Sequence, residues 1–342
     1  MVIALFVMIL PTSNFAQNSN KKLKALIIDG ENNHGIWPKT TMMMKDYLEQ
    51  TGLFEIDIQR KKYTWVGPHY NKKRLEVDTI IDLLTKYPLK TGIETIPVNE
   101  TKFDSLFNPN FEDYDVVVSN LGWKSSELPE QTKKNFEHYI ANGGGLVIVH
   151  AANNAWGDWE TYNDMIALGG WGGRDSISGP YVYYNKEGNI VHDPVEGSCA
   201  SHGAEYEYLV ETREPTHPIM KGLPTAWLHA DDELYDRLRG PGDNMTILAT
   251  AYSDVEKNAP PWNEKMKGTG RHEPMIFTVD YGKGKIFHTP MGHMDYSMEC
   301  VGFITIFQRG AEWAATGKVT QEIPDDFPTD KASSSRKWTV VK

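Results

Sequence analysis

Three of the eleven histidines in this 342-residue chain stand at or shortly after the end of a short apolar run. They are His34, His150 and His293. Imidazole exchanges protons near neutral pH, and its neutral form binds metal ions. Three such positions predict a functional cluster for acid–base chemistry or for a divalent metal ion. Because the chain has no His-Glu-x-x-His motif, any metal site must be assembled from distant segments.

Two adjacent carboxylates form a second candidate group. Asp232 and Glu233 lie between aromatic residues, close to Tyr235. A carboxylate can act as a general base, accept hydrogen bonds from sugar hydroxyls or orient an imidazole. The alternative is a solvated acidic surface. His272 precedes another apolar run and either lines the same opening or lies on an ordinary loop.

Several other chemistries lack their motifs. The chain contains no Gly-x-x-x-x-Gly-Lys-Ser/Thr phosphate loop and no Gly-x-Ser-x-Gly nucleophile elbow. The glycines at 143–145 precede an apolar run, so they are typical of a helix end and not of a dinucleotide-binding turn. Cys199 lies near His202, but no orienting partner is evident for a cysteine nucleophile. Cys199 and Cys300 either pair or remain free thiols.

The elements that would position these residues follow a strand–helix–strand pattern. Buried parallel strands are predicted at 23–29, 115–119 and 146–149, with a further strand at 54–58. Helices are predicted from Pro38 to about residue 50 and over 128–140. Short connections between such elements indicate an open, mostly parallel sheet. Ligands of such sheets bind at the carboxyl ends of the strands, which adds Asn120 and Trp123 to the candidate site.

The second half of the chain is expected to contain four more strands and a closing helix. The strands are predicted at 206–211, 246–252, 275–280 and 285–289, and the helix at 300–315. Residues 169–203 show no clear periodicity and are interpreted as an inserted lid or loop. Residues from 324 onward are expected to form a loose polar tail.

Composition limits the partners. The net charge of −11 argues against binding to nucleic acid or to an anionic membrane surface. Residues 1–16 resemble a secretory signal, which predicts an exported, periplasmic or secreted protein with no later membrane span. Ten Trp and sixteen Tyr supply aromatic faces that can stack on sugar rings or fill a core.

An ordered set of motifs resembles the ThuA-like (trehalose utilisation) family. It runs from Gly-Gly-Gly-Leu-Val-Ile-Val-His-Ala-Ala at 143–152, through His-Pro-Ile-Met-Lys-Gly-Leu-Pro at 217–224 and Asp-Glu-Leu-Tyr at 232–235, to Tyr-Gly-Lys-Gly at 281–284 and Arg-Gly-Ala-Glu-Trp-Ala at 309–314. The resemblance implies one domain over 23–318, followed by a tail at 319–342. It also implies a flavodoxin-like sheet with helices on both faces, related to the class I glutamine amidotransferase-like fold. Those relatives carry a cysteine nucleophile where this chain has His150, so we do not expect amidotransferase activity.

The family's link to disaccharide use and to 3-keto-glycosides suggests a function. We expect an enzyme that acts on a glycoside or keto-sugar by hydrolysis, elimination or isomerisation. His150 and Glu233 are the expected proton-transfer pair, with Asp232 beside them. His34 and His293 would hold a hydroxyl or a metal ion, and the stacking surfaces would be Trp123 and Trp156.

Two other functions are left open by the sequence. They are a non-catalytic carbohydrate-binding protein and a metal-dependent hydrolase. No organic cofactor is evident, and a divalent metal ion is an option. The expected partner is a small carbohydrate. The sequence also allows a homo-oligomer.

Overall fold

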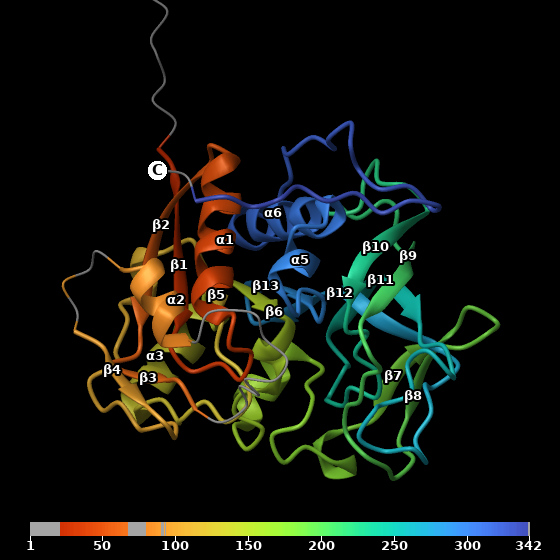
Figure 1. Ribbon diagram of the computed structural model, residues 1–342, viewed down its shortest axis with the longest axis horizontal. Coiled ribbons are helices and arrows are strands. Elements are labelled where there is room, and N and C mark those ends of the chain that lie inside the picture. The colour runs from red at the N-terminus through yellow and green to blue at the C-terminus, as the bar shows by residue number, and fades with distance from the viewer. Residues whose placement is uncertain (1–20, 68–79, 90–91, 93, 341–342) are drawn as a thin grey trace, which may run out of the picture.

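The computed structural model describes residues 21–67, 80–89, 92 and 94–340 (Figure 1). In this part of the chain, eleven strands form one mixed sheet. Its central strands are parallel and lie in the order β2 (Phe54–Arg60), β1 (Leu23–Asp29), β5 (Val116–Ser119), β6 (Gly145–Val149) and β13 (Gly284–Thr289). The mostly parallel sheet predicted from the sequence is confirmed for this central part. The expected signal segment, residues 1–16, lies outside the described residues.

Antiparallel strands extend the sheet beyond β13. The sequence predicted strands in this region but not their antiparallel pairing. A two-residue turn at Gly282 and Lys283 joins β12 to β13, and so short a connection allows only antiparallel pairing. The extension continues through β12 (His272–Tyr281), β11 (Met245–Tyr252), β9 (Tyr206–Thr212) and β10 (Ala226–Asp232). The segment interpreted as a lid forms a hairpin of β7 (Tyr181–Tyr184) and β8 (Ile190–Asp193), which pairs with β12.

Helices cover both faces of the sheet. Figure 1 shows α1 (Trp37–Gln50) and α6 (Val301–Thr316) side by side on one face, with α5 (Asp295–Met298) close to them. The opposite face carries α3 (Glu130–Ala141) and α4 (Glu160–Ile166). The smaller elements are α2 (Ile80–Lys86), which packs on α1, and the two-stranded sheet of β3 (Tyr63–Trp65) and β4 (Ile96–Val98). None of the described helices is long and apolar enough to cross a membrane.

Two hydrophobic cores lie on the two faces, and the central strands contribute to both. In β1, Ala25 and Ile27 pack under α1 and α6, whereas Leu26 and Ile28 pack toward α3 and α4. All four side chains are buried, because a parallel strand covered by helices has no solvated face. This explains why the strand is a continuous apolar run, and truncation of Ile27 to alanine is expected to cost about 2–5 kcal/mol.

The C-terminal segment is not the loose tail that its polar sequence suggested. The indole of Trp338 is buried and donates a hydrogen bond to Asp46 of α1 (3.0 Å), and its backbone amide donates to Glu299 (2.9 Å). Farther upstream, Phe327 packs against Trp227 of β10, with 5.5 Å between ring centroids. Two aromatic residues therefore anchor a segment that is otherwise polar.

The strand order places a cleft-forming edge beside β1. The chain leaves β1 toward β2 and later returns on the other side of β1 as β5, so the loops after β1 and β5 diverge at their carboxyl ends. Hydrogen bonds hold these loops together: Asn32 donates to the backbone oxygens of Asn120 and Leu121 (both 3.3 Å), and the amide of Trp123 donates to Asn33 (2.9 Å). This edge carries His34, Asn120 and Trp123 of the predicted site.

Candidate functional site

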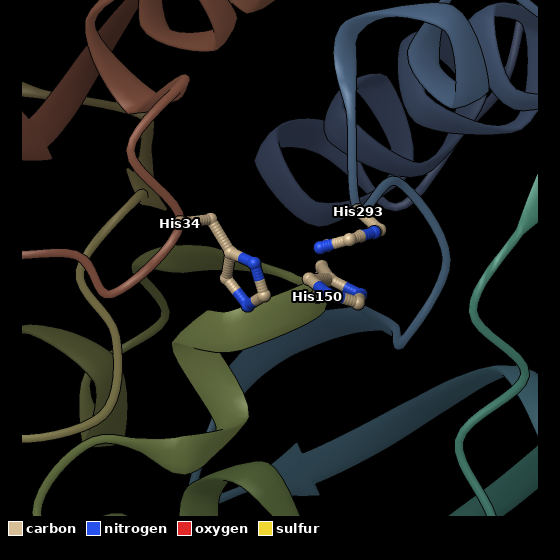
Figure 2. A group of neighbouring side chains, drawn as sticks. All are labelled: His34, His150 and His293. Carbon is tan, nitrogen blue, oxygen red and sulfur yellow. The ribbon is translucent and has the colours of Figure 1, made fainter. Parts of the chain in front are cut away.

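Figure 2 shows the three strand-end histidines facing one another. His34 comes from the loop between β1 and α1, His150 from the end of β6, and His293 from the loop between β13 and α5. The ring centroid of His34 lies 4.8 Å from that of His150 and 4.6 Å from that of His293, and the other two are 5.2 Å apart. The structure therefore brings the predicted histidines together.

His150 is fixed through both of its ring nitrogens. Nδ1 lies 2.7 Å from the carbonyl oxygen of Pro290 and must carry the proton, because a carbonyl only accepts. Nε2 consequently accepts a hydrogen bond from the hydroxyl of Tyr235 (2.8 Å). Burial, together with the nearby charge of His293, lowers the pKa of His150 to about 3. His150 is thus neutral at pH 7, and its lone pair is already engaged.

The pKa of His293 is shifted in the opposite direction from that of His150. Its Nδ1 lies 2.6 Å from Glu205, which also accepts a hydrogen bond from Tyr296. Burial alone would lower the pKa of His293, but the carboxylates of Glu233, Glu205 and Asp232 outweigh it and raise the pKa. These carboxylates therefore stabilise the imidazolium form of His293 relative to its neutral form.

Glu233 lies at the centre of the imidazole groups. Its Oε1 is 3.3 Å from Nδ1 of His202 and 3.5 Å from Nε2 of His293, and its Oε2 is 3.7 Å from Nε2 of His150. Only 8% of the residue is exposed. A carboxylate in this position can exchange a proton with a ligand or with a neighbouring imidazole.

Asp232 anchors the site and lines neither the pocket nor the hollow described below. Its buried carboxylate accepts hydrogen bonds from the amides of Glu233 (3.0 Å), Gly292 (2.7 Å) and His293 (3.0 Å), and from Nε2 of His229 (2.9 Å). Burial would raise its pKa, but His229 and the backbone donors lower it to about 2. Both oxygens of Asp232 are thus occupied by hydrogen bonds that tie the site together, and its catalytic role stays a prediction from the sequence.

The loop that carries His293 depends on a glycine. Gly292 has a φ of +99°, and a Cβ atom there would lie 2.7 Å from the ring of Phe303. Only glycine fits this turn, because an L side chain would meet both the backbone restriction and the ring. Together with the hydrogen bonds to Asp232, this turn sets the direction of His293.

An open pocket of ≈ 590 Å³ lies beside the histidines. Most of its lining is aromatic or carries an amide, and it comprises Asn33, His34, Trp123, Asn154, Trp171, His202, Tyr235 and Trp262. Behind it is a hollow of ≈ 10 Å³, lined among others by His34, His150, His293 and Asn120. The hollow holds at most a water molecule. His34 lines both spaces and so separates the pocket from the hollow.

Three residues predicted to bind substrate lie elsewhere. The amide of Asn120 donates to Thr41 (2.8 Å) and ties the β5 loop to α1 behind the pocket. Trp156 lines a neighbouring groove, and His272 contacts Glu211 and Tyr252 on the antiparallel strands. His272 lines neither the pocket nor the hollow. Of the predicted stacking residues, Trp123 alone reaches the pocket.

Several residues of the site were missed from the sequence. Among them are His202, Glu205, Trp171 and Trp262. His202 is neutral at pH 7, because burial lowers its pKa to about 4. The first three precede β9 in or just after the segment interpreted as a lid, where no periodicity pointed to the site. The only available signal was the proximity of His202 to Cys199, which is a free thiol, as is Cys300.

Two overlapping groups have the composition of a metal site. The nitrogens of His34, His150 and His293 lie within 4.8 Å of one another, as do the ligand atoms of Glu205, Glu233 and His293. Imidazole and carboxylate ligands suit zinc and related divalent ions. His34, His150 and His293 could hold such an ion, provided that Tyr235 releases Nε2 of His150.

The fold and the site together define an α/β protein with a ligand pocket at its strand ends, where imidazoles and carboxylates meet an aromatic wall. The chain belongs to the ThuA (trehalose utilisation) family, whose model matches residues 24–314. The predicted resemblance is therefore confirmed, and with it the connection of the family to carbohydrate metabolism.

A solved structure agrees with this assignment. The chain is 41% identical to a ThuA-like protein from Parabacteroides merdae, with a TM-score of 0.76, over 92% of this chain and 98% of that one. A ThuA-like protein from Bacteroides uniformis is 18% identical, with a TM-score of 0.49, over 90% of this chain and 97% of that one. No curated protein matches the chain.

Proposed function

We propose that this protein is an enzyme that acts on a glycoside or keto-sugar by acid–base catalysis, with Glu233 as base and His293 as acid. The observation that carries the proposal is the position of Glu233, a buried carboxylate among three imidazoles beside an aromatic pocket. The pair differs from the one expected from the sequence, because the lone pair of His150 already accepts from Tyr235.

The reaction suited to this pair is an elimination or isomerisation next to a keto group. A carbonyl acidifies the adjacent C–H bond, so that a carboxylate is a sufficient base. In elimination, Glu233 takes that proton, the C–H electrons form the new double bond, and the bond to the leaving oxygen breaks. His293 gives its proton to that oxygen. Glu205 holds the imidazolium in place, which favours the acid form before the reaction.

The pocket supports a carbohydrate as the substrate. Trp123, Trp171 and Trp262 present apolar faces on which a sugar ring can stack, and Asn33 and Asn154 offer amides for its hydroxyls. A protein that only binds sugar would need these walls but not a buried carboxylate in contact with histidines. This difference favours an enzyme over a binding protein.

The direct test is incubation of the purified protein with methyl and aryl 3-keto-glucosides, followed by NMR. We expect new sugar signals that grow in proportion to enzyme concentration. Absence of turnover with these substrates and with the corresponding unoxidised glycosides would overturn the proposal.

A metal-dependent hydrolase is the second candidate, favoured by the two groups of potential ligands around His293. It predicts a stoichiometric divalent ion in protein purified without added metal, and loss of activity in chelator that the same ion restores. Elemental analysis that finds no stoichiometric metal ion, together with full activity after chelation, would favour acid–base catalysis over this alternative.

We also infer two broader properties. The parallel strands have the order second, first, third, fourth, fifth along the sheet, which supports a flavodoxin-like fold. The apolar N-terminal sequence supports export with cleavage after Ala16. Mass spectrometry of the mature protein from fractionated cells tests the second inference, and an intact N-terminus in the cytoplasmic fraction would contradict it.

A further inference from the structure

A second groove adjoins the pocket. It has a volume of ≈ 610 Å³ and lies along α3, α4 and the loops after β5 and β6. Trp123 and Asn154 line both the groove and the pocket, so the two spaces are neighbours across these side chains. We propose that the groove binds the second sugar ring of a glycoside whose first ring occupies the pocket. This inference rests on the proposed function of the pocket.

Aromatic side chains line the groove in a fixed arrangement. Trp156 and Trp159 are half-buried, with 5.5 Å between ring centroids, and Trp156 meets Tyr162 edge to face at 5.0 Å. The indole nitrogen of Trp156 donates to the backbone oxygen of Ser126 (3.0 Å). A tryptophan held in this way can offer its exposed part to a sugar ring at little entropic cost.

The backbone around the groove and the pocket is strained. Trp156 has a φ of 46°, Trp171 has 47° and His150 has 45°. Bulky L residues rarely adopt this left-handed conformation, and such strain persists where the surroundings enforce it, which is frequently at ligand sites. Trp156 lines the groove, Trp171 the pocket, and His150 stands at the reacting centre. The same distortion therefore marks both spaces.

Asn154 lies at the junction between the groove and the pocket. It is 2% exposed and lines both spaces, and its Oδ1 has no hydrogen-bond partner among the residues that the structure describes. Buried amide oxygens are almost always satisfied in native proteins. A hydroxyl near the linkage between two sugar rings would supply the donor that this oxygen lacks.

The charges of the groove favour a neutral ligand. Its lining includes the ammonium groups of Lys124, Lys133 and Lys134 and five carboxylates, those of Glu127, Glu130, Glu137, Asp158 and Glu160. Lys133 lies 3.4 Å from Glu127 and 3.3 Å from Glu130, so part of the charge is paired. A phosphorylated ligand would meet an excess of acidic groups, whereas hydroxyls can bond to both kinds of charge.

Calorimetric titration tests the groove without requiring turnover. The probes are glucose disaccharides with α,α-1,1, α-1,4 and β-1,4 linkages, each compared with the methyl glucoside of the same anomer. For the wild type we expect at least one disaccharide to bind about tenfold more tightly than its methyl glucoside. Similar affinities throughout the series, or no saturable disaccharide binding, would overturn the inference.

Two variants locate the effect. Trp156→Ala removes the aromatic surface, and Thr161→Trp fills the groove from α4 without removing any of the aromatic contacts. Both should bring the disaccharide-to-monosaccharide affinity ratio close to one, with circular dichroism used to verify folding. A ratio that stays at the wild-type value in folded Thr161→Trp protein would overturn the inference.

The titration can fail or succeed separately from the test of the catalytic proposal. Turnover of methyl 3-keto-glucosides with no preference for disaccharides would support the reaction and remove the second subsite. Preferential disaccharide binding with no turnover of any keto-glycoside would support the groove and remove the reaction.

Discussion

The two halves of the sheet contribute different chemistry to the site. The parallel half ends in His34, His150 and His293, whereas the antiparallel half brings the carboxylates of Glu205 and Glu233. The contact between His293 and Glu233, the proposed acid and base, spans the two halves. The comparison indicates that the antiparallel extension completes the site.

A buried contact links the halves. The carboxylate of Asp232, at the end of β10, accepts hydrogen bonds from the amides of Gly292 and His293 after β13. The same carboxylate also accepts hydrogen bonds from the amide of Glu233 and from the ring of His229, both in its own segment. Asp232 therefore holds both partners of the proposed acid–base pair. We expect its substitution to shift the positions of Glu233 and His293 and to lower the free energy of unfolding together.

Removal of the base should have the largest effect. In Glu233→Gln the antiparallel half loses its proton acceptor while the size of the side chain is kept. We expect turnover of a keto-glucoside to fall by about 10²–10⁴-fold, the usual contribution of a general base. Since Glu233 also raises the pKa of His293, NMR titration should show a lower pKa for that histidine.

The matched control for this variant is Glu196→Gln, an exposed carboxylate in the same antiparallel region. It should retain wild-type turnover. Activity of Glu233→Gln within about threefold of the wild type would show that the antiparallel half does not supply the base.

Breaking the link between the halves should be the most damaging change to stability. Asp232→Ala leaves three backbone amides and the buried His229 without their acceptor. We expect the free energy of unfolding to fall by about 3–5 kcal/mol, as for removal of one partner of a buried ion pair. Urea denaturation measures it.

Asp231→Ala is the control for the link, because Asp231 is the exposed neighbour on the same strand. Its effect should remain within about 0.5 kcal/mol. Equal losses in the two variants would mean that the strand end, and not the buried carboxylate, joins the halves.

The sequence predicted the parallel half better than the antiparallel half for a physical reason. Parallel strands such as β1 are buried on both faces and form continuous apolar runs, and Pro38 marks the start of the following helix. In β10, a buried ion pair of His229 and Asp232 interrupts the apolar pattern. It therefore resembles a polar loop, although the burial of these groups depends on their contact with each other.

The site residues of the parallel half were likewise predicted better than those of the antiparallel half. Each predicted histidine follows an apolar strand, so the strand-end rule located His34, His150 and His293 without knowledge of the structure. His202 and Glu205 precede β9 and reach the site only because the antiparallel strands turn back along the sheet. Tertiary packing fixes that return, and no local spacing encodes it.

Stability at mildly acidic pH should report on one neutral histidine from each half. The pKa values of His150 and His202 are lowered to about 3 and about 4, below the ordinary value near 6.5. Between pH 6.5 and 4 the unfolded chain therefore binds more protons than the folded one, so stability falls as the pH falls. Each histidine should remove roughly 1–2 kcal/mol between pH 7 and 5.

Urea unfolding of His150→Asn and His202→Asn at several pH values tests this expectation. Each variant should lose less stability than the wild type on acidification. Parallel pH profiles for all three proteins would show that neither histidine is kept neutral by burial, which would remove the electrostatic contrast with His293.

The smallest effect is expected at the outer wall of the pocket. Trp262 comes from the antiparallel half, is 56% exposed, and lies 4.6 Å from the ring of His202. Replacement by alanine should weaken binding of a methyl glucoside by about 2–12-fold, which corresponds to the 0.5–1.5 kcal/mol typical of an aromatic contact. The free energy of unfolding should change by less than about 0.5 kcal/mol, because few contacts are lost.

Phe103→Ala is the matched control, since Phe103 is a similarly exposed aromatic residue (52%) that lies outside the pocket lining. Calorimetry should find unchanged sugar affinity in this variant. If both substitutions weakened binding equally, the loss would reflect a general change in the protein surface. If only Trp262→Ala did so, the antiparallel half would supply a wall of the pocket in addition to its carboxylates, and the division between the two halves would extend from catalysis to recognition.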